Sequence, residues 1–134
     1  MLRFAIPVLH VTSSVAAEEF YCGPLGFETQ FVHRPDPTKT DPCYLGVSRD
    51  GVRLHLSSFS GDGAAGGVVF LAVDDVDALH AELLSRGVAI DTAPVDQTWG
   101  NREMYVRDAD RNSLRFIQEK KTPAALGASA DSGL

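Results

Sequence analysis

The order of predicted strands and helices repeats once along the chain, and this repeat restricts the fold more than any other feature. In the first half, the β-branched and apolar stretch "LRFAIPVLHV" predicts a strand, and Ser13 or Ser14 then caps a helix through "VAAEEFY". Gly23 and Pro24 cannot continue that helix. Three strands are expected after it, in "FETQFVH", "CYLGVS" and "VRLHLSSF", the last two joined by an Asp-Gly turn.

The same order returns after a polar, glycine-rich linker, "SGDGAAGG", at residues 60–67. "VVFLAV" predicts a strand, and Asp74 or Asp75 caps a helix that ends at Gly87. The apolar residues that recur on one face of this helix, and are expected in the core, are Val76, Leu79 and Leu83. Strands follow in "VAIDTA", "REMYVRD" and "SLRFIQ", and the last two form a hairpin around "DADRN".

Both halves therefore have the order βαβββ, and they superpose without large gaps. Module one spans about residues 4–59 and module two about residues 68–118, which predicts an α+β fold. A chain of 134 residues is long enough for one core of ordinary size, so we expect a single domain over residues 1–120. Residues 121–134 have little to bury and are expected to form a disordered tail.

Composition and charge exclude several classes of protein. The net charge is -6 and no basic stripe exists, which argues against nucleic-acid binding. No apolar run approaches the ~18 residues of a membrane span, and the short apolar N-terminal run leads into Glu18 and Glu19, unlike a signal peptide. Cys22 and Cys43 lack the spacing of a zinc site or a disulfide framework. We therefore expect free thiols in a cytoplasmic protein.

Several motifs occur in an order that resembles the vicinal oxygen chelate superfamily, which includes glyoxalase I, extradiol dioxygenases and bleomycin-resistance proteins. These motifs are "PVLHV", "FYCGPLGF", "LAVDDVDAL", "RGV" and "WGNREMYVRDADRNSLRF", and the likeness covers about residues 4–118. "IPVL" and Trp99-Gly100 are most similar to the bleomycin-resistance branch. The resemblance implies that the two modules form an open eight-stranded cup, and that the protein is a homodimer.

The family turn Asp-Pro-Asp-Gly-Asn has Ala109 for Pro and Arg111 for Gly in this chain. Without the glycine, either Arg111 accepts the turn geometry or Asn112 adopts the left-handed conformation.

In metal-using members of the superfamily, the ligands lie on inward faces of the first and last strands of each module. Superposing the modules places Ile6 on Val68 and His55 on Arg115 at these positions. Ile and Val offer no lone pair and Arg stays protonated, so only His55 could bind a divalent ion. His10, farther along the first strand, is a weak alternative ligand. We therefore expect no metal site and no cofactor.

Five residues are expected to bind a small-molecule ligand in the cup: His55, Trp99, Glu103, Tyr105 and Arg115. His55 and Arg115 lie between apolar neighbours, and a hairpin symmetric about Asp110 places Tyr105 opposite Arg115. Alternatively, Arg115 pairs with Glu103 or an aspartate, and His55 with a backbone carbonyl. Trp99, the only tryptophan, either stacks on a flat ligand or packs as a lid over the sheet edge.

Two functions remain open. The first is a metal-free, homodimeric protein of the bleomycin-resistance type that sequesters a drug or metabolite and has no catalytic residues. The second is a glyoxalase- or dioxygenase-like enzyme acting on a small oxygenated substrate. It would either have its metal ligands at positions other than those assigned above, or be a metal-free catalyst with His55 as base and Arg115 and Tyr105 as electrophiles. The net charge favours a cationic ligand, whereas His55 and Arg115 favour a carboxylate or phosphate, so the ligand stays unassigned.

Overall fold

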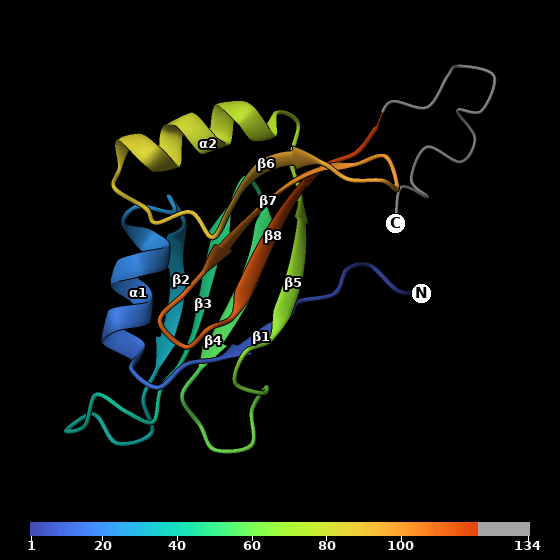
Figure 1. Ribbon diagram of the computed structural model, residues 1–134. Coiled ribbons are helices and arrows are strands. Elements are labelled where there is room, and N and C mark those ends of the chain that lie inside the picture. The colour runs from blue at the N-terminus through green and yellow to red at the C-terminus, as the bar shows by residue number, and fades with distance from the viewer. Residues whose placement is uncertain (121–134) are drawn as a thin grey trace. The chain divides into compact units, whose positions relative to one another are not determined.

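The computed structural model describes residues 1–120 and contains the predicted order βαβββ twice (Figure 1). The first module consists of β1 (Val8–His10), α1 (Ser14–Cys22), β2 (Glu28–His33), β3 (Tyr44–Arg49) and β4 (Val52–Ser57). The second consists of β5 (Val68–Ala72), α2 (Val76–Ser85), β6 (Thr92–Asp96), β7 (Arg102–Arg107) and β8 (Ser113–Gln118). The predicted α+β class and the tandem modules are therefore confirmed. The predicted tail, residues 121–134, lies outside the described residues.

The chain divides into two compact units, which are described separately. One unit contains Met1–Val69 and Arg107–Ser113, and the other contains Phe70–Val106 and the chain from Leu114 onward. The strands form two four-stranded sheets, with the orders β1-β4-β3-β2 and β5-β8-β7-β6.

In the first sheet, β1 pairs with β4 in parallel and the other neighbours are antiparallel. Helix α1 lies against β2, β3 and β4, and its N-cap is Ser13, whose side chain accepts a hydrogen bond from the Ala16 N–H (Figure 1). The apolar residues buried in this unit include Leu9, Val11, Tyr21, Leu45, Val47, Leu54 and Leu56. They alternate along the strands, as expected for a sheet with one face packed on a helix.

In the second module, α2 lies against β6 and is capped by Asp75, which accepts from the Ala78 N–H. Val76 and Leu83 are fully buried, as predicted. Leu79 is only partly buried, so its assignment to the core was wrong. The buried face of this short helix is formed by Val76 and Leu83, and Leu79 lies at the edge of that face.

Two strands begin later than their sequences suggest. The first begins at Val8 rather than near Leu2, because Pro7 has no N–H to donate to a neighbouring strand. The Pro7 carbonyl accepts a hydrogen bond from the His55 N–H, and the residues before it are not part of the strand. The strand expected in residues 88–93 begins at Thr92. After Gly87 (φ 80°), the Val88 N–H bonds back to the Leu83 carbonyl, and contact with β7 starts only at Asp91, whose N–H donates to the Tyr105 carbonyl.

Hydrogen bonds within each unit support the superposition of the two modules. The Val11 N–H donates to the Ser57 carbonyl, and the Val73 N–H donates to the Ile117 carbonyl. This correspondence places Ile6 on Val68, as the sequence indicated, although Ile6 itself precedes β1.

The segment 107–113, which contains the predicted hairpin turn, is held by buried polar contacts. Asn112 accepts a hydrogen bond from the Gly67 N–H and donates to the His10 carbonyl and to Asp108. Asp108 also accepts from the Tyr21 hydroxyl at 2.8 Å. Arg111 has φ 67°, so Arg111 rather than Asn112 takes the left-handed conformation.

Candidate functional site

In the first unit, the sheet face opposite α1 carries His55. Leu54 and Leu56 are buried on the helix side of β4, and His55 between them is partly buried on the other side. Its cross-strand neighbours are Val8 on β1 and Gly46 on β3. The alternation predicted from "VRLHLSSF" is therefore confirmed, and it directs the imidazole away from α1.

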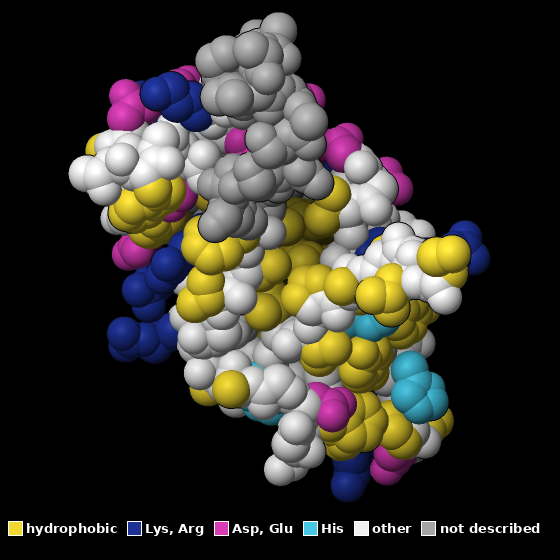
Figure 2. Space-filling view, turned by 90° about the vertical axis from the view of Figure 1, so that its right-hand side faces the viewer, with side chains coloured by type: hydrophobic (Ala, Val, Ile, Leu, Met, Phe, Trp, Pro, Cys, Tyr) yellow, Lys and Arg dark blue, Asp and Glu magenta, His cyan; other side chains and the backbone are white. Residues whose placement is uncertain are grey.

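Two aromatic side chains join His55 on this face. The rings of Phe31 and Tyr44 are stacked with centroids 6.1 Å apart, and each ring centroid lies 5.2 Å from the imidazole. Phe31 lies over Gly46, where an added Cβ would collide with the Cε2 of the Phe31 ring. Gly46 therefore permits this position of the Phe31 ring, which is 42% exposed. Figure 2 shows hydrophobic side chains gathered on one face, with histidine side chains among them.

The environment of His55 favours its neutral form. Burial, and then the charge of Arg53, lower the pKa of His55 below its usual range. The His55 Nδ1 and the Tyr44 hydroxyl are 2.8 Å apart and share a hydrogen bond. Burial and the charge of Asp62 raise the pKa of Tyr44, so the phenol keeps its proton. The partner of His55 is thus a hydroxyl and not the backbone carbonyl that was one alternative.

In the second unit, a carboxylate joins two aromatic residues of the β6–β7 hairpin. The Trp99 Nε1 donates to the Glu103 Oε2 at 2.8 Å, and the Tyr105 hydroxyl donates to the Glu103 Oε1 at 2.6 Å. The bond to Glu103, followed by burial, raises the pKa of Tyr105. Glu103 is 1% exposed, whereas Trp99 is 62% exposed. Most of the indole surface is therefore accessible within this unit.

Arg115 completes this cluster from β8. Its guanidinium carbon lies 4.8 Å from the Tyr105 ring centroid and 5.7 Å from that of Phe70 on β5. A guanidinium over an aromatic face is a favourable arrangement. The predicted proximity of Tyr105 and Arg115 across the hairpin is confirmed.

The backbone that carries Trp99 is a closed turn. The Gly100 N–H donates to the Gln97 carbonyl at 3.0 Å, and the Gln97 N–H donates to the Asn101 carbonyl at 2.8 Å. Gly100 has φ 105°, a conformation that favours glycine. The turn therefore projects Trp99 from the tip of the hairpin at a defined place.

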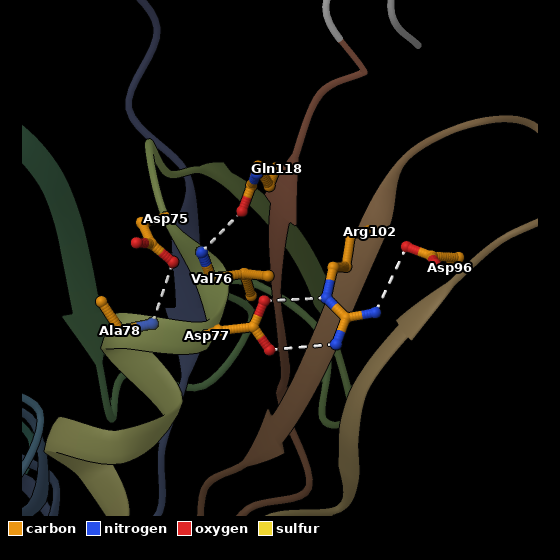
Figure 3. Close-up of polar contacts among 7 residues, drawn as sticks. All are labelled: Asp75, Val76, Asp77, Ala78, Asp96, Arg102 and Gln118. Atoms are coloured by element: carbon orange, nitrogen blue, oxygen red, sulfur yellow. Dashed lines mark hydrogen bonds and ion pairs between the residues drawn. The ribbon is translucent and has the colours of Figure 1, made fainter.

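Charged contacts tie the same hairpin to α2 (Figure 3). The Arg102 guanidinium donates to both carboxylate oxygens of Asp77 at 2.9 and 3.0 Å, and to Asp96 at 3.2 Å. The Gln118 side chain accepts from the Val76 N–H at the start of α2. Because neighbours on a strand point to opposite faces, Arg102 contacts α2 while Glu103 points away from it.

Of the five predicted ligand-binding residues, the second unit brings together Trp99, Glu103, Tyr105 and Arg115, and the first unit holds His55. The sequence analysis missed Phe31, Tyr44 and Gly46. A period-two alternation through "ETQFVH" and "CYLGVS" would have placed all three on the face of His55, but the irregular register between Thr29 and Phe31 interrupts that alternation.

Residues 1–123 match a family model described as glyoxalase superfamily protein. The chain belongs to the glyoxalase superfamily. It is 28% identical over 137 residues to the bleomycin resistance protein of Geobacillus stearothermophilus, covering 88% of this chain and 96% of the relative. The predicted family and its bleomycin-resistance branch are thus confirmed.

Solved structures of this superfamily have the same fold. A bleomycin-binding protein complexed with bleomycin matches with a TM-score of 0.72 and 23% identity, covering 89% of this chain and 100% of that chain. TnmS3, an antibiotic binding protein from Streptomyces sp. CB03234, matches with a TM-score of 0.65 and 27% identity, covering 88% of this chain and 98% of that chain.

The four positions at which the family resemblance implied metal ligands are Ile6, His55, Val68 and Arg115 in this chain. Within residues 1–120, no three His, Cys, Asp or Glu side chains are grouped closely enough to hold a metal ion. Both cysteines are free, Cys43 buried and Cys22 partly exposed. No helix in that part of the chain is long and apolar enough to cross a membrane.

Proposed function

We propose that this chain is a drug-binding protein of the bleomycin-resistance type, which sequesters bleomycin or a similar small molecule without changing it chemically. The bleomycin resistance protein relatives and the solved bleomycin complex support this proposal. The observation that carries it is the exposed Trp99 indole, held by Glu103 in a cluster with Tyr105 and Arg115. An exposed aromatic ring in a fixed position is suited to stacking on a flat group of a ligand.

The first unit offers a second aromatic surface, formed by Phe31, Tyr44 and His55. Because the imidazole is biased toward its neutral form, this surface suits an uncharged ring or the aromatic part of a cation. His55, Trp99, Tyr105 and Arg115 are proposed as ligand contacts.

Binding in this proposal needs no metal. His55 is the one residue at the superfamily's four metal positions with a lone pair to donate, and a single imidazole is not a site for a divalent ion. Arg115 would also repel a cation placed beside it. The proposal therefore assigns sequestration, and not the metal-assisted chemistry of the superfamily enzymes, to this chain.

The proposal includes a homodimer in the cytoplasm. Val68 and Phe70 on the edge strand β5 are 50% and 44% exposed, and a second copy could cover such residues. A cytoplasmic location would keep Cys22 and Cys43 in the reduced, free-thiol state.

Thermal shift and mass spectrometry test this proposal together. Metal-free bleomycin should raise the melting temperature of protein treated with chelator, because a ligand of the folded state stabilises it. Zinc, nickel, manganese and iron should not raise it, and bleomycin recovered after incubation should have an unchanged mass. A metal-dependent shift abolished by His55→Ala, or a drug of altered mass, would contradict the proposal and favour an enzyme.

A further inference from the structure

Glu103 is almost completely buried, and both oxygens of its carboxylate already accept a hydrogen bond, one from Trp99 and one from Tyr105. The indole that it holds is mostly exposed. We propose, on the basis of the drug-binding function above, that Glu103 is a positioning residue for the ligand and not a contact. It fixes the Trp99 indole as a preformed stacking surface and makes that surface select planar cations over neutral rings of the same shape.

The orientation of Trp99 follows from two independent constraints. The closed turn from Gln97 to Asn101 fixes the backbone, and the 2.8 Å bond to Glu103 fixes the indole edge. Glu103 is itself on the regular strand β7, which Arg102 ties to α2 through Asp77. An aromatic side chain that is already ordered before binding loses less conformational freedom when the ligand arrives.

The charge preference follows from the position of the carboxylate. A hydrogen bond from an indole N–H to an ionised acceptor places a negative charge at the ring edge, and its field is stronger where water is excluded. A cation over the face of a tryptophan is also attracted by the ring's own quadrupole. The Arg115 guanidinium lies over the rings of Tyr105 and Phe70, 4.8 and 5.7 Å from their centroids.

The spectroscopic arm uses the ligand-free protein, because Trp99 is its only tryptophan and all tryptophan emission comes from this site. In the wild type, time-resolved anisotropy of Trp99 should decay with the tumbling of the whole molecule. Caesium should quench the emission more efficiently than iodide, since the neighbouring carboxylate attracts the cation. Glu103→Gln should add a fast anisotropy component and reduce the ratio of caesium to iodide quenching.

The binding arm compares N-methylquinolinium, a planar cation, with neutral 1-methylnaphthalene of similar shape. The wild type should bind the cation about five-fold more tightly than the neutral ring, and Glu103→Gln should reduce that preference to what the indole quadrupole alone supplies. Asp96→Asn is the matched control, because it removes the same charge from the same hairpin but its carboxylate contacts Arg102 and not Trp99. Tyr105→Phe retains the Trp99–Glu103 bond and should keep the slow anisotropy.

The outcomes separate this inference from the proposed function. If Glu103→Gln behaves like Asp96→Asn in both arms, Glu103 does not position Trp99 and the inference is wrong. If the wild type binds neither bleomycin nor the probes but its anisotropy and quenching depend on Glu103 as described, the drug-binding function fails while the positioning role stands. If Glu103→Gln does not fold, the wild-type quenching ratio decides: equal quenching by caesium and iodide would overturn the proposed charge selection.

Discussion

His55 carries, at the scale of single residues, the clearest electrostatic signal of the first unit. Its imidazole packs edge-on against Phe31 and Tyr44 and lies on the same strand as Arg53. The lowered pKa follows from that position, because both burial and a nearby cation oppose protonation.

This shift predicts how stability depends on pH. The unfolded chain binds a proton at His55 at about pH 6.5, whereas the folded chain does so only at lower pH. Stability from this group is therefore complete above about pH 6.5 and is lost as the pH falls through the folded pKa. Urea unfolding should show that the free energy of unfolding falls more between pH 7.5 and pH 5.0 for the wild type than for His55→Gln. Equal losses would refute this account of His55.

Trp99 and Leu83 differ in burial, and this difference predicts opposite effects of truncation. Trp99→Ala should weaken bleomycin binding with little change in melting temperature, because the ring is 62% exposed. Leu83→Ala should lower the free energy of unfolding by about 2 to 5 kcal/mol, because Leu83 is fully buried. Drug titration and chemical unfolding of both variants test the pair, and the reverse ranking would show that Trp99 is structural.

Arg111 occupies the left-handed region with φ 67°, at a position where its β-carbon is unfavourable. Arg111→Gly should raise the free energy of unfolding by about 1 kcal/mol, since glycine adopts this conformation without steric cost. Arg111→Ala keeps the β-carbon and serves as the control. Similar urea midpoints for the two variants would mean that the side chain, and not the backbone, determines the effect.

At the scale of elements, the turn in segment 107–113 is bonded to α1 and to the residues that follow β1, all within the first unit. Tyr21 of α1 donates to Asp108, and Thr12 donates to Asp110. Beside these bonds lies a cavity of about 130 Å³, lined by Thr12, Ser13, Ala16, Ala17, Phe20, Asp108, Ala109 and Asp110. The turn is thus fixed by hydrogen bonds, but side chains do not fill the space beside it.

Ala109→Pro should stabilise the protein by about 0.5 to 1 kcal/mol, because proline suits the second position of a turn and restricts the unfolded chain. The turn is closed by the Arg111 N–H, which donates to the Asp108 carbonyl. The control is Asp110→Pro, which removes an N–H that donates to the Asp108 side chain and should destabilise the protein. Thermal unfolding of both variants should give shifts of opposite sign, and a lower melting temperature for Ala109→Pro would contradict the prediction.

At the scale of the whole molecule, the sequence predicted the repeat because hydrophobic alternation, capping residues and glycines agree with one another. The caps at Ser13 and Asp75 and the Asp50-Gly51 turn are all present. The start of β6 at Thr92 was not predictable, because only pairing with Tyr105 decides where the ladder begins.

Much of the candidate site depends on contacts that sequence patterns do not encode. The proximity of Tyr105 and Arg115 followed from the symmetry of a hairpin. The Trp99–Glu103 bond required the geometry of a specific turn, and the aromatic cluster of the first unit formed across three strands around Gly46.

The proposed dimer is a property of the whole molecule. Sedimentation equilibrium at micromolar concentration should give twice the mass of the 14.4 kDa chain. Replacing the exposed Phe70 on edge strand β5 by Glu should shift the protein toward the monomer, because a charge would be desolvated in the interface. A monomeric wild type would contradict this part of the proposal.

The claim that this chain sequesters a drug without metal is tested most directly by calorimetric titration of chelator-treated protein with metal-free bleomycin, in a buffer that retains the chelator. The account predicts saturable binding with quenching of Trp99 emission, at an affinity that added zinc does not increase and Trp99→Ala weakens. No binding heat in the presence of chelator, with binding restored by a divalent metal, would contradict it.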